Sequence, residues 1–369
     1  MKFAMIPNST ESNNTISISW GNKQEILVVT CIAILTGFLL KIPSIFDLNE
    51  DAYFARNFSI IGMPSLLGYS LYTSKQSIKQ YWHILVIALS LVGYLHIIPT
   101  DLENPVFVLI CLHAPVVLWF LFGKAYLDNA WKSPDIRVDF IRFNGEVVIM
   151  AGLLLISGLL FSAITIALFE LINMRIEDIY FEYVGIWGIG AIPVLSLYLI
   201  HNNKNLVQNI SPVIAKLFTL PALILLLIFS VMLSQSQQMI FDDREFLLVF
   251  NLILLAVMAL ILFSFKNLQD STFQHYLLFG LTTITIIDNI FALLAIGYRL
   301  IEFGISPNRL ALCGLNFLMF GHISIICFRI MQVISRTKSI QSVLRTMGKY
   351  LHIYLLWAIF VMVGFPLIF

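Results

Sequence analysis

The sequence predicts an all-helical integral membrane protein with about eleven transmembrane helices in one bundle. Of its 369 residues, 59% are hydrophobic and only 12% are charged, with a mean hydropathy of +0.90. Long apolar runs recur along the whole chain, near the ~20 residues that a helix needs to cross a bilayer. This composition excludes a soluble globular protein. The formal net charge of +1 and the short polar stretches give no reason to expect a nucleic-acid partner.

The chain begins with a polar segment rich in Asn and Ser. We expect residues 1–24 to be a disordered tail and residues 25–369 to be a single polytopic domain. The tail has no cationic stretch leading into a short apolar core, so the pattern does not predict a signal peptide.

Eleven apolar runs predict the spans. They are residues 26–46, 54–72, 82–98, 106–122, 147–172, 183–200, 217–233, 246–265, 276–301, 310–328 and 351–369. The runs at 147–172 and 276–301 are longer than a bilayer requires and predict tilted helices. The second run contains Gly62, Pro64 and Gly68. Interrupted helices often line a cavity, but proline kinks also occur without a ligand, and whether this run makes a full crossing stays open.

The distribution of charge predicts the orientation. With the N-terminus in the cytoplasm and the C-terminus in the periplasm, 16 of the 22 basic residues fall in cytoplasmic segments. Acidic residues gather in or beside the outer loops. We therefore expect a multi-pass protein of a bacterial inner membrane.

Two cytoplasmic segments, residues 124–142 and 329–349, mix apolar and charged residues at roughly helical spacing. Both predict interfacial helices, and the basic side chains Arg336, Lys338, Arg345 and Lys349 would face anionic lipid. Ordinary interfacial anchoring is the alternative to a specific lipid site.

An intramembrane polar site is expected near the middle of the ninth run, at Asp288 and Asn289. A charged side chain there costs about 2.5 to 3.5 kcal/mol, so it must face protein or water. The functional interpretation is an ion or proton site, and the structural one is a neutral, hydrogen-bonded Asp. His322 lies at a similar predicted depth and would be a partner for Asp288, unless it bonds a backbone carbonyl instead. Asn251 and Asn316 have comparable predicted depths.

An outer-face cluster is expected around the turn after the ninth run, formed by Arg299, Glu302, Asn308 and Arg309. These residues would cap a periplasmic pocket, or Asn308 would simply cap the next helix. Arg56, at the outer end of the second run, would meet an anionic group or extend to the interface.

Several patterns together resemble the bacterial membrane proteins grouped as domain of unknown function 4153. They are residues 51–57 (DAYFARN), the run RFNGE at 142–146, DRE at 243–245 leading to Asn251, and YR at 298–299 followed by GISPNR at 304–309. The resemblance covers the chain from the first span to the last. It implies a polytopic bacterial inner-membrane protein and supplies no catalytic residues.

Enzyme motifs and metal-ligand spacings are not found in the sequence, so we expect no cofactor and no metal, and an enzyme is the less favoured class. Three hypotheses follow. The first is permease-like or proton-linked transport, the second a scaffold or sensor subunit that binds a protein partner or a second copy, and the third an enzyme acting on envelope lipid.

Overall fold

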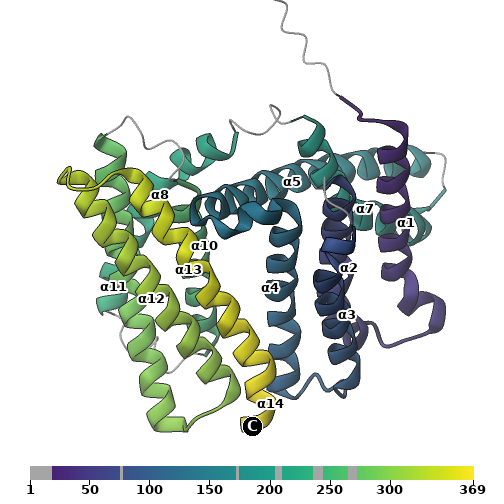
Figure 1. Ribbon diagram of the computed structural model, residues 1–369. Helices are drawn as coiled ribbons and strands as arrows, with labels where there is room; N and C mark the ends of the chain where they lie inside the picture. The colour runs from purple at the N-terminus through teal and green to yellow at the C-terminus, as the bar shows by residue number, and fades with distance from the viewer. Residues whose placement is uncertain (1–18, 75–77, 172–173, 204–209, 236–243, 265–271) are drawn as a thin grey trace, which may run out of the picture.

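The computed structural model describes residues 19–74, 78–171, 174–203, 210–235, 244–264 and 272–369, and contains no strand among them (Figure 1). Most of the predicted tail lies outside the described residues. The principal helices are α1 (Lys23–Phe46), α2 (Glu50–Thr73), α3 (Trp82–Ile97), α4 (Pro105–Leu127), α5 (Pro134–Glu170), α6 (Glu177–Tyr180), α7 (Ile186–Asn202), α8 (Ile210–Gln235), α10 (Arg244–Ser264), α11 (Thr272–Phe303), α12 (Pro307–Ile334), α13 (Ile340–Ile359) and α14 (Phe365–Ile368).

Eight helical segments among the described residues are long and apolar enough to cross a membrane. They are Lys23–Phe46, Pro105–Leu127, Pro134–Glu170, Glu177–Asn202, Glu245–Ser264, Thr272–Phe303, Pro307–Ile334 and Ile340–Ile368. The all-helical, multi-pass architecture is thereby confirmed. All eleven predicted runs fall on helices, but α3 and the apolar part of α8 (Leu217–Val231) are shorter, and α2 is not among the eight.

The helices form two groups with α4 between them (Figure 1). The first group contains α1, α2, α3 and α7, and the second contains α8, α10, α11, α12 and α13. Each has its own apolar core: Val29, Val194 and Leu197 are buried in the first, and Leu254, Leu281 and Ile323 in the second. α4 joins the groups, because its Ile110 shares a core with Leu67 of α2 and Ile84 of α3, and its Leu109 packs against Ala311 of α12.

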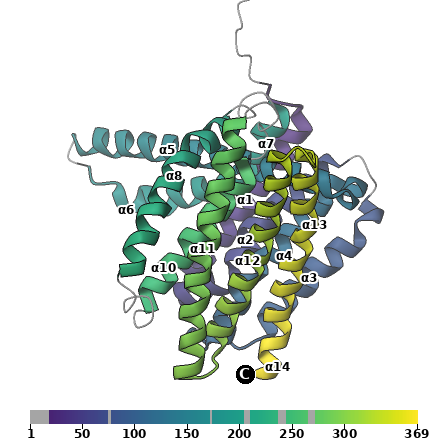
Figure 2. The ribbon, with the colours of Figure 1, turned by 90° about the vertical axis from the view of Figure 1, so that its left-hand side faces the viewer.

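Helix α5 runs crosswise to the other long helices in both views (Figures 1 and 2). We expected an interfacial segment at 124–142 followed by a separate tilted span at 147–172. Instead residues 124–127 end α4, Asp128–Lys132 form a 3-10 turn, and α5 is continuous from Pro134 to Glu170. Pro134 suits this start, since its fixed φ favours the first helical turn.

The segment 329–349 also differs from expectation. It is not a separate interfacial helix, because α12 continues to Ile334 and α13 begins at Ile340. A short turn joins them, in which Arg336 has a φ of 58°. α13 then runs without interruption into its membrane-crossing part, so Arg336 and Lys338 lie in the turn, and Arg345 and Lys349 lie near the start of α13.

Helices α1 and α7 approach each other closely through two glycines. A Cβ placed on Gly190 would lie 3.0 Å from the Cα of Gly37. A Cβ on Gly37 would overlap the ring of Trp187. Small residues allow this backbone approach in membranes. At one end of the pair, Lys41 Nζ lies 2.9 Å from Glu182 Oε1.

Candidate functional site

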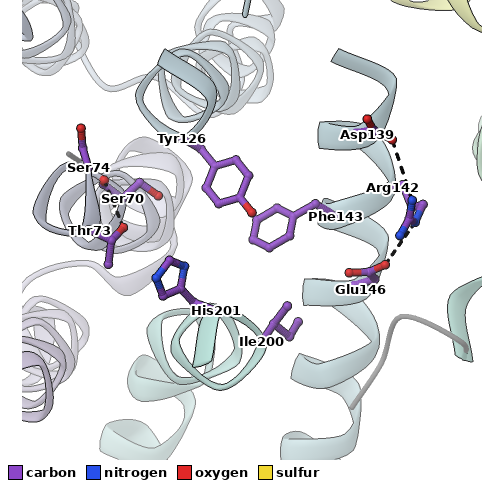
Figure 3. A pocket seen from close by; sticks show the side chains of 10 residues that line it. All are labelled: Ser70, Thr73, Ser74, Tyr126, Asp139, Arg142, Phe143, Glu146, Ile200 and His201. Atoms are coloured by element: carbon purple, nitrogen blue, oxygen red, sulfur yellow. Dashed lines mark hydrogen bonds and ion pairs between the residues drawn. The ribbon is translucent and has the colours of Figure 1, made fainter. Parts of the chain in front are cut away.

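A polar pocket of about 500 Å³ opens where α2, α4 and α7 end and α5 passes over them (Figure 3). This volume is within the range of small-molecule sites. The lining side chains come from all four helices: Ser70, Thr73, Ser74, Tyr126, Asp139, Arg142, Phe143, Glu146, Ile200 and His201. Their polar character contrasts with the apolar helices around them.

The charged groups of the pocket all lie on one face of α5, at spacings of three and four residues. Arg142 Nε is 3.2 Å from Glu146 Oε1, and Arg142 Nη1 is 3.8 Å from Asp139 Oδ1. Glu146 is buried, whereas the Asp139 side chain is 71% exposed. The pocket therefore holds two carboxylates and one guanidinium, with His201 on the opposite wall (Figure 3).

Ser70 lies on the wall formed by α2. Its side chain is 2% exposed, and its hydroxyl has no hydrogen-bond partner in the structure. Figure 3 shows the hydroxyl on the side of α2 that faces the cavity. A buried, unpartnered hydroxyl costs free energy, so it is a group that a ligand would satisfy.

A buried carboxylate lies beside the pocket at the start of α1. Glu25 is 7% exposed, and its Oε1 accepts hydrogen bonds from Tyr69 (2.5 Å) and from Asn202 Nδ2 (2.7 Å). Tyr69 also contacts the ring of His201 edge-on, at 5.9 Å between centroids. This network connects α1, α2 and α7 directly behind the pocket wall.

The predicted intramembrane site does not pair Asp288 with His322 among the contacts that the structure shows. Asp288 is fully buried, and its Oδ1 accepts a hydrogen bond from Ser230 Oγ on α8 at 2.5 Å. Its Oδ2 has no partner. His322 instead stacks on Tyr350 at 4.3 Å, and its Nδ1 lies 3.3 Å from the hydroxyl of Tyr354. Both tyrosines belong to α13, so His322 joins α12 to α13.

Three asparagines of the predicted site do form one chain of hydrogen bonds. Asn316 Nδ2 donates to Asn251 Oδ1 at 2.5 Å, and Asn289 Nδ2 donates to Asn316 Oδ1 at 3.0 Å. All three are buried, and they belong to three different helices: Asn251 to α10, Asn289 to α11 and Asn316 to α12. Asn251 and Asn316, which were expected at comparable depths, are therefore in direct contact.

At the outer-face cluster the helix cap differs from expectation. Ser306, not Asn308, caps α12, and its Oγ accepts from the backbone N–H of Arg309. Asn308 lies in the first turn, one residue after Pro307. A serine with extended backbone satisfies the free N–H groups there.

Phe303 lies between the two arginines of this cluster. The guanidinium carbons of Arg299 and Arg309 are 5.6 and 5.4 Å from its ring centroid. Arg309 also donates to the carbonyls of Phe303 and Gly304, both at 2.8 Å, and so closes the turn. Glu302 is exposed on the same turn.

Arg56 and the basic residues near α13 are placed as follows. Arg56 Nη2 donates to the carbonyl of Ile98 at 2.6 Å, and its guanidinium lies over the ring of Phe107, so Arg56 joins α2 to the loop after α3.

Among the basic residues near α13, Arg345 forms an ion pair with Asp135 of α5 at 3.3 Å. The other three predicted lipid-facing residues are exposed: Arg336, Lys338 and Lys349.

No family model, curated protein or solved structure matches the chain.

The pocket contains residues that sequence reasoning did not select as a site. The sequence points to Arg142 and Glu146 only through the resemblance, and sequence reasoning does not select Glu25, Tyr69 or His201. One signal was present: Glu25 follows Asn22 and Lys23 and immediately precedes the first apolar run, where a carboxylate is costly unless it is bonded. The meeting of α2, α5 and α7 has no signature in the sequence.

Proposed function

We propose that this multi-pass membrane protein is permease-like, and that a small polar solute binds in the pocket between α2, α4, α5 and α7. One observation carries the proposal: a cavity of about 500 Å³ lined by Asp139, Arg142, Glu146 and His201 within an otherwise apolar helix bundle. Polar and ionisable groups at such positions mark solute pathways in membrane proteins.

The orientation follows from charge and from the fold. We propose a bacterial inner-membrane protein, as the resemblance implies, with a cytoplasmic N-terminus and a periplasmic C-terminus, as the distribution of basic residues predicts. In support, the C-terminus lies at the opposite end of the molecule from the start of α1 (Figure 1). The pocket, which lies close to the start of α1, then opens towards the cytoplasm.

Asp288 supplies the proposed link to protons. It is a fully buried carboxyl whose Oδ2 has no partner. Asp288 belongs to the second helix group, whereas the pocket is lined by α2 and α7 of the first group together with α4 and α5. Solute binding and protonation would therefore occur in different groups, joined by α4 and α5.

Anionic lipid is the proposed partner at the cytoplasmic face. Arg336, Lys338 and Lys349 are exposed around the turn between α12 and α13. Cationic side chains beside a membrane-crossing helix attract anionic headgroups at about 1 kcal/mol each.

Accessibility of a single cysteine tests permeation. Thr73 lines the pocket, so Thr73→Cys is made in a background where Cys31, Cys111, Cys313 and Cys327 are replaced by Ala. A membrane-impermeant maleimide is then applied to inside-out and right-side-out vesicles. We expect fast labelling from the cytoplasmic side and slower, measurable labelling from the periplasmic side, because a permease alternates its access.

Leu102→Cys, on the exposed loop after α3, is the control that reacts from the periplasmic side alone. If Thr73→Cys reacts from one side only, the pocket does not belong to a permeation route and the proposed function is wrong.

A further inference from the structure

We propose that a second cavity, where α3 begins and α4 ends, binds the phosphate headgroup of an anionic lipid. This α3 cavity has a volume of about 540 Å³, and its lining includes Gln80, Tyr81, Lys124, Asp128, Trp131 and Lys132. It shares no lining residue with the pocket described above, and the inference does not depend on permeation.

A tight connection between α4 and α5 brings two lysines to the α3 cavity. Lys124 lies in the last turn of α4, which ends at Leu127. Asp128, with a φ of 51°, then breaks the helix and leads into the 3-10 turn, which ends at Lys132. Both lysines therefore border the cavity from the side of α4.

No protein group neutralises the two lysines. In the part of the chain that the structure describes, the side chains of Lys124 and Lys132 form no ion pair, not even with the neighbouring carboxylate of Asp128. Both side chains are exposed. Each ammonium group has three donors, so both are available to an anion that enters the cavity.

A buried guanidinium adds positive potential behind the 3-10 turn. Arg137 donates to the carbonyls of Trp131 and Lys132, which removes two acceptors that the lysines could otherwise use. Its other partners are the carbonyl of Gly348 and the ring of His352, so no carboxylate bonds Arg137 among the described residues. An anion close to such a buried, uncompensated charge is stabilised.

The two helix ends at the α3 cavity balance each other. α3 begins at Trp82 without a side-chain cap, so the free N–H groups of its first turn carry a partial positive charge. The final carbonyls of α4 carry a similar negative charge. Two lysines against one carboxylate then decide the sign, and a phosphate monoester, with a charge of about −1.5 to −2 at neutral pH, matches the two lysines.

Aromatic side chains fix the walls of the α3 cavity. The ring of Trp131 packs against Phe120 and Phe140, with centroids 5.7 and 5.9 Å away. Tyr81 is buried, and its hydroxyl shares a hydrogen bond with Ser74 Oγ at 2.6 Å, which holds the start of α3 against the end of α2. The lysines are therefore the adaptable part of a cavity whose frame is packed.

The outer surface of α3 indicates that the phosphate belongs to a lipid. Trp82, Val86 and Leu89 are exposed, and their spacing places them on one face of the helix, starting at the cavity. Tryptophan is enriched where a helix meets the membrane interface. The acyl chains of a bound lipid would cover this apolar face, whereas a free phosphate would gain nothing from it.

The test is native mass spectrometry of the full chain in detergent, titrated with three probes. Dioctanoyl phosphatidic acid and dioctanoyl phosphatidylcholine share their acyl chains and a phosphate, but the choline cancels the charge. Glycerophosphate has the phosphate without the chains. We expect phosphatidic acid to bind most tightly, glycerophosphate more weakly, and phosphatidylcholine without any dependence on the lysines.

Lys124→Gln and Lys132→Gln should each weaken the binding of phosphatidic acid about 5-fold, and the double variant about 25-fold, as expected for cationic side chains near an anionic headgroup. Lys23→Gln, at the exposed first residue of α1, is the matched control and should leave the affinity unchanged. All these side chains are exposed, so we expect the variants to fold.

A second background separates this site from the basic turn between α12 and α13. The double variant should lose the same factor when Arg336, Lys338 and Lys349 are also replaced by Gln. If the effect disappears in that background, the phosphatidic acid is bound at the turn and the α3 cavity is not the site.

Three other outcomes overturn the inference. An equal loss in Lys23→Gln would mean that the lipid responds to surface charge in general. Equal affinities for phosphatidic acid and glycerophosphate would mean that the ligand is a free phosphate and not a lipid. Binding of phosphatidylcholine with the same affinity and the same dependence on the lysines would mean that the cavity does not select negative charge.

Discussion

The guanidinium of Arg137 on α5 donates a hydrogen bond to the backbone carbonyl of Gly348 on α13, at 2.7 Å. Arg137 is 7% exposed, and it also bonds the carbonyls of Trp131 and Lys132 and the ring of His352. A single side chain thus joins the 3-10 turn, the crosswise helix and the last long helix.

Replacing Gly348 by Ala should separate α5 from α13. A Cβ at this position would overlap the carbonyl oxygen of Pro134, which is backbone and cannot rotate away. We expect a loss of about 1 to 3 kcal/mol in the free energy of unfolding, typical of overpacking. Equilibrium unfolding in detergent measures it. Gly152→Ala, where nothing lies within 4 Å, is the control and should be neutral or slightly stabilising. Equal stability of the two variants would contradict this packing.

Replacing Arg137 by Met should destabilise the same junction by about 3 kcal/mol, because several buried carbonyls lose their donor at once. Arg137→Lys should restore only part of this, since an ammonium cannot reach carbonyls in the planar arrangement of a guanidinium. The free energies of unfolding of the two variants and the parent protein, measured in the same detergent, check this order of stability. The same stability for Lys and Arg would show that charge alone suffices.

Asp288 and Ser230 should be coupled in a double-mutant cycle. Asp288→Asn keeps the acceptor oxygen, and we expect the protein to stay folded while any proton-linked flux is abolished. Asp288→Ala, Ser230→Ala and the double variant form the cycle and should give a coupling of about 0.6 to 1.7 kcal/mol, as measured for hydrogen bonds in membranes. Additive effects would mean that the bond between α8 and α11 contributes nothing. Unchanged flux in Asp288→Asn would refute the proton link.

Asn316 should matter more for stability than Asn289. Asn316 bonds both Asn251 and Asn289, so Asn316→Ala leaves two buried amides with fewer partners, whereas Asn289→Ala leaves one. We expect a difference of about 1 kcal/mol between the variants. Thermal unfolding of the three single alanine variants gives the ranking, and a larger loss at Asn289 would disagree with the chain of bonds.

The protein should tolerate an exchange of Lys41 and Glu182 better than a reversal of the charge at either position alone. Their ion pair joins α1 to the helical turn before α7, and the Lys41 side chain is only 7% exposed. Lys41→Glu or Glu182→Lys places like charges together and should lower the yield of folded protein. The double reversal should recover most of it, as measured by size-exclusion chromatography. No recovery would mean that the position of each charge, and not their attraction, is required.

The membrane character of the fold was predictable because apolar runs are a local property of the chain. The eleven runs all fall on helices, and Asn251 and Asn316, for which helical rise predicts comparable depths, form a hydrogen bond. The direction in which a helix runs in the folded protein, by contrast, depends on tertiary contacts and not on the local sequence. α5 has an apolar run fit for a span, yet Arg137 and Gly145 pack its first half across α13 and Phe263 of α10.

The candidate site was less accessible to sequence reasoning. Asp288 and His322 were expected to meet from their depths, but depth does not fix the rotation of a helix about its axis. Asp288 faces α8 and His322 faces α13. The pocket depends on residues as far apart as Ser70 and His201, whose helices converge only through tertiary packing.

The continuous helix α5 touches both helix groups and crosses them near one end of the molecule. A straight helix resists bending far more than a packed interface resists sliding. Any rearrangement that widens the pocket must therefore tilt α5 as a lever, with its contacts around Arg137 serving as the pivot and its exposed apolar end sweeping through lipid. The thickness and stiffness of the surrounding bilayer would then set the work required to admit a solute.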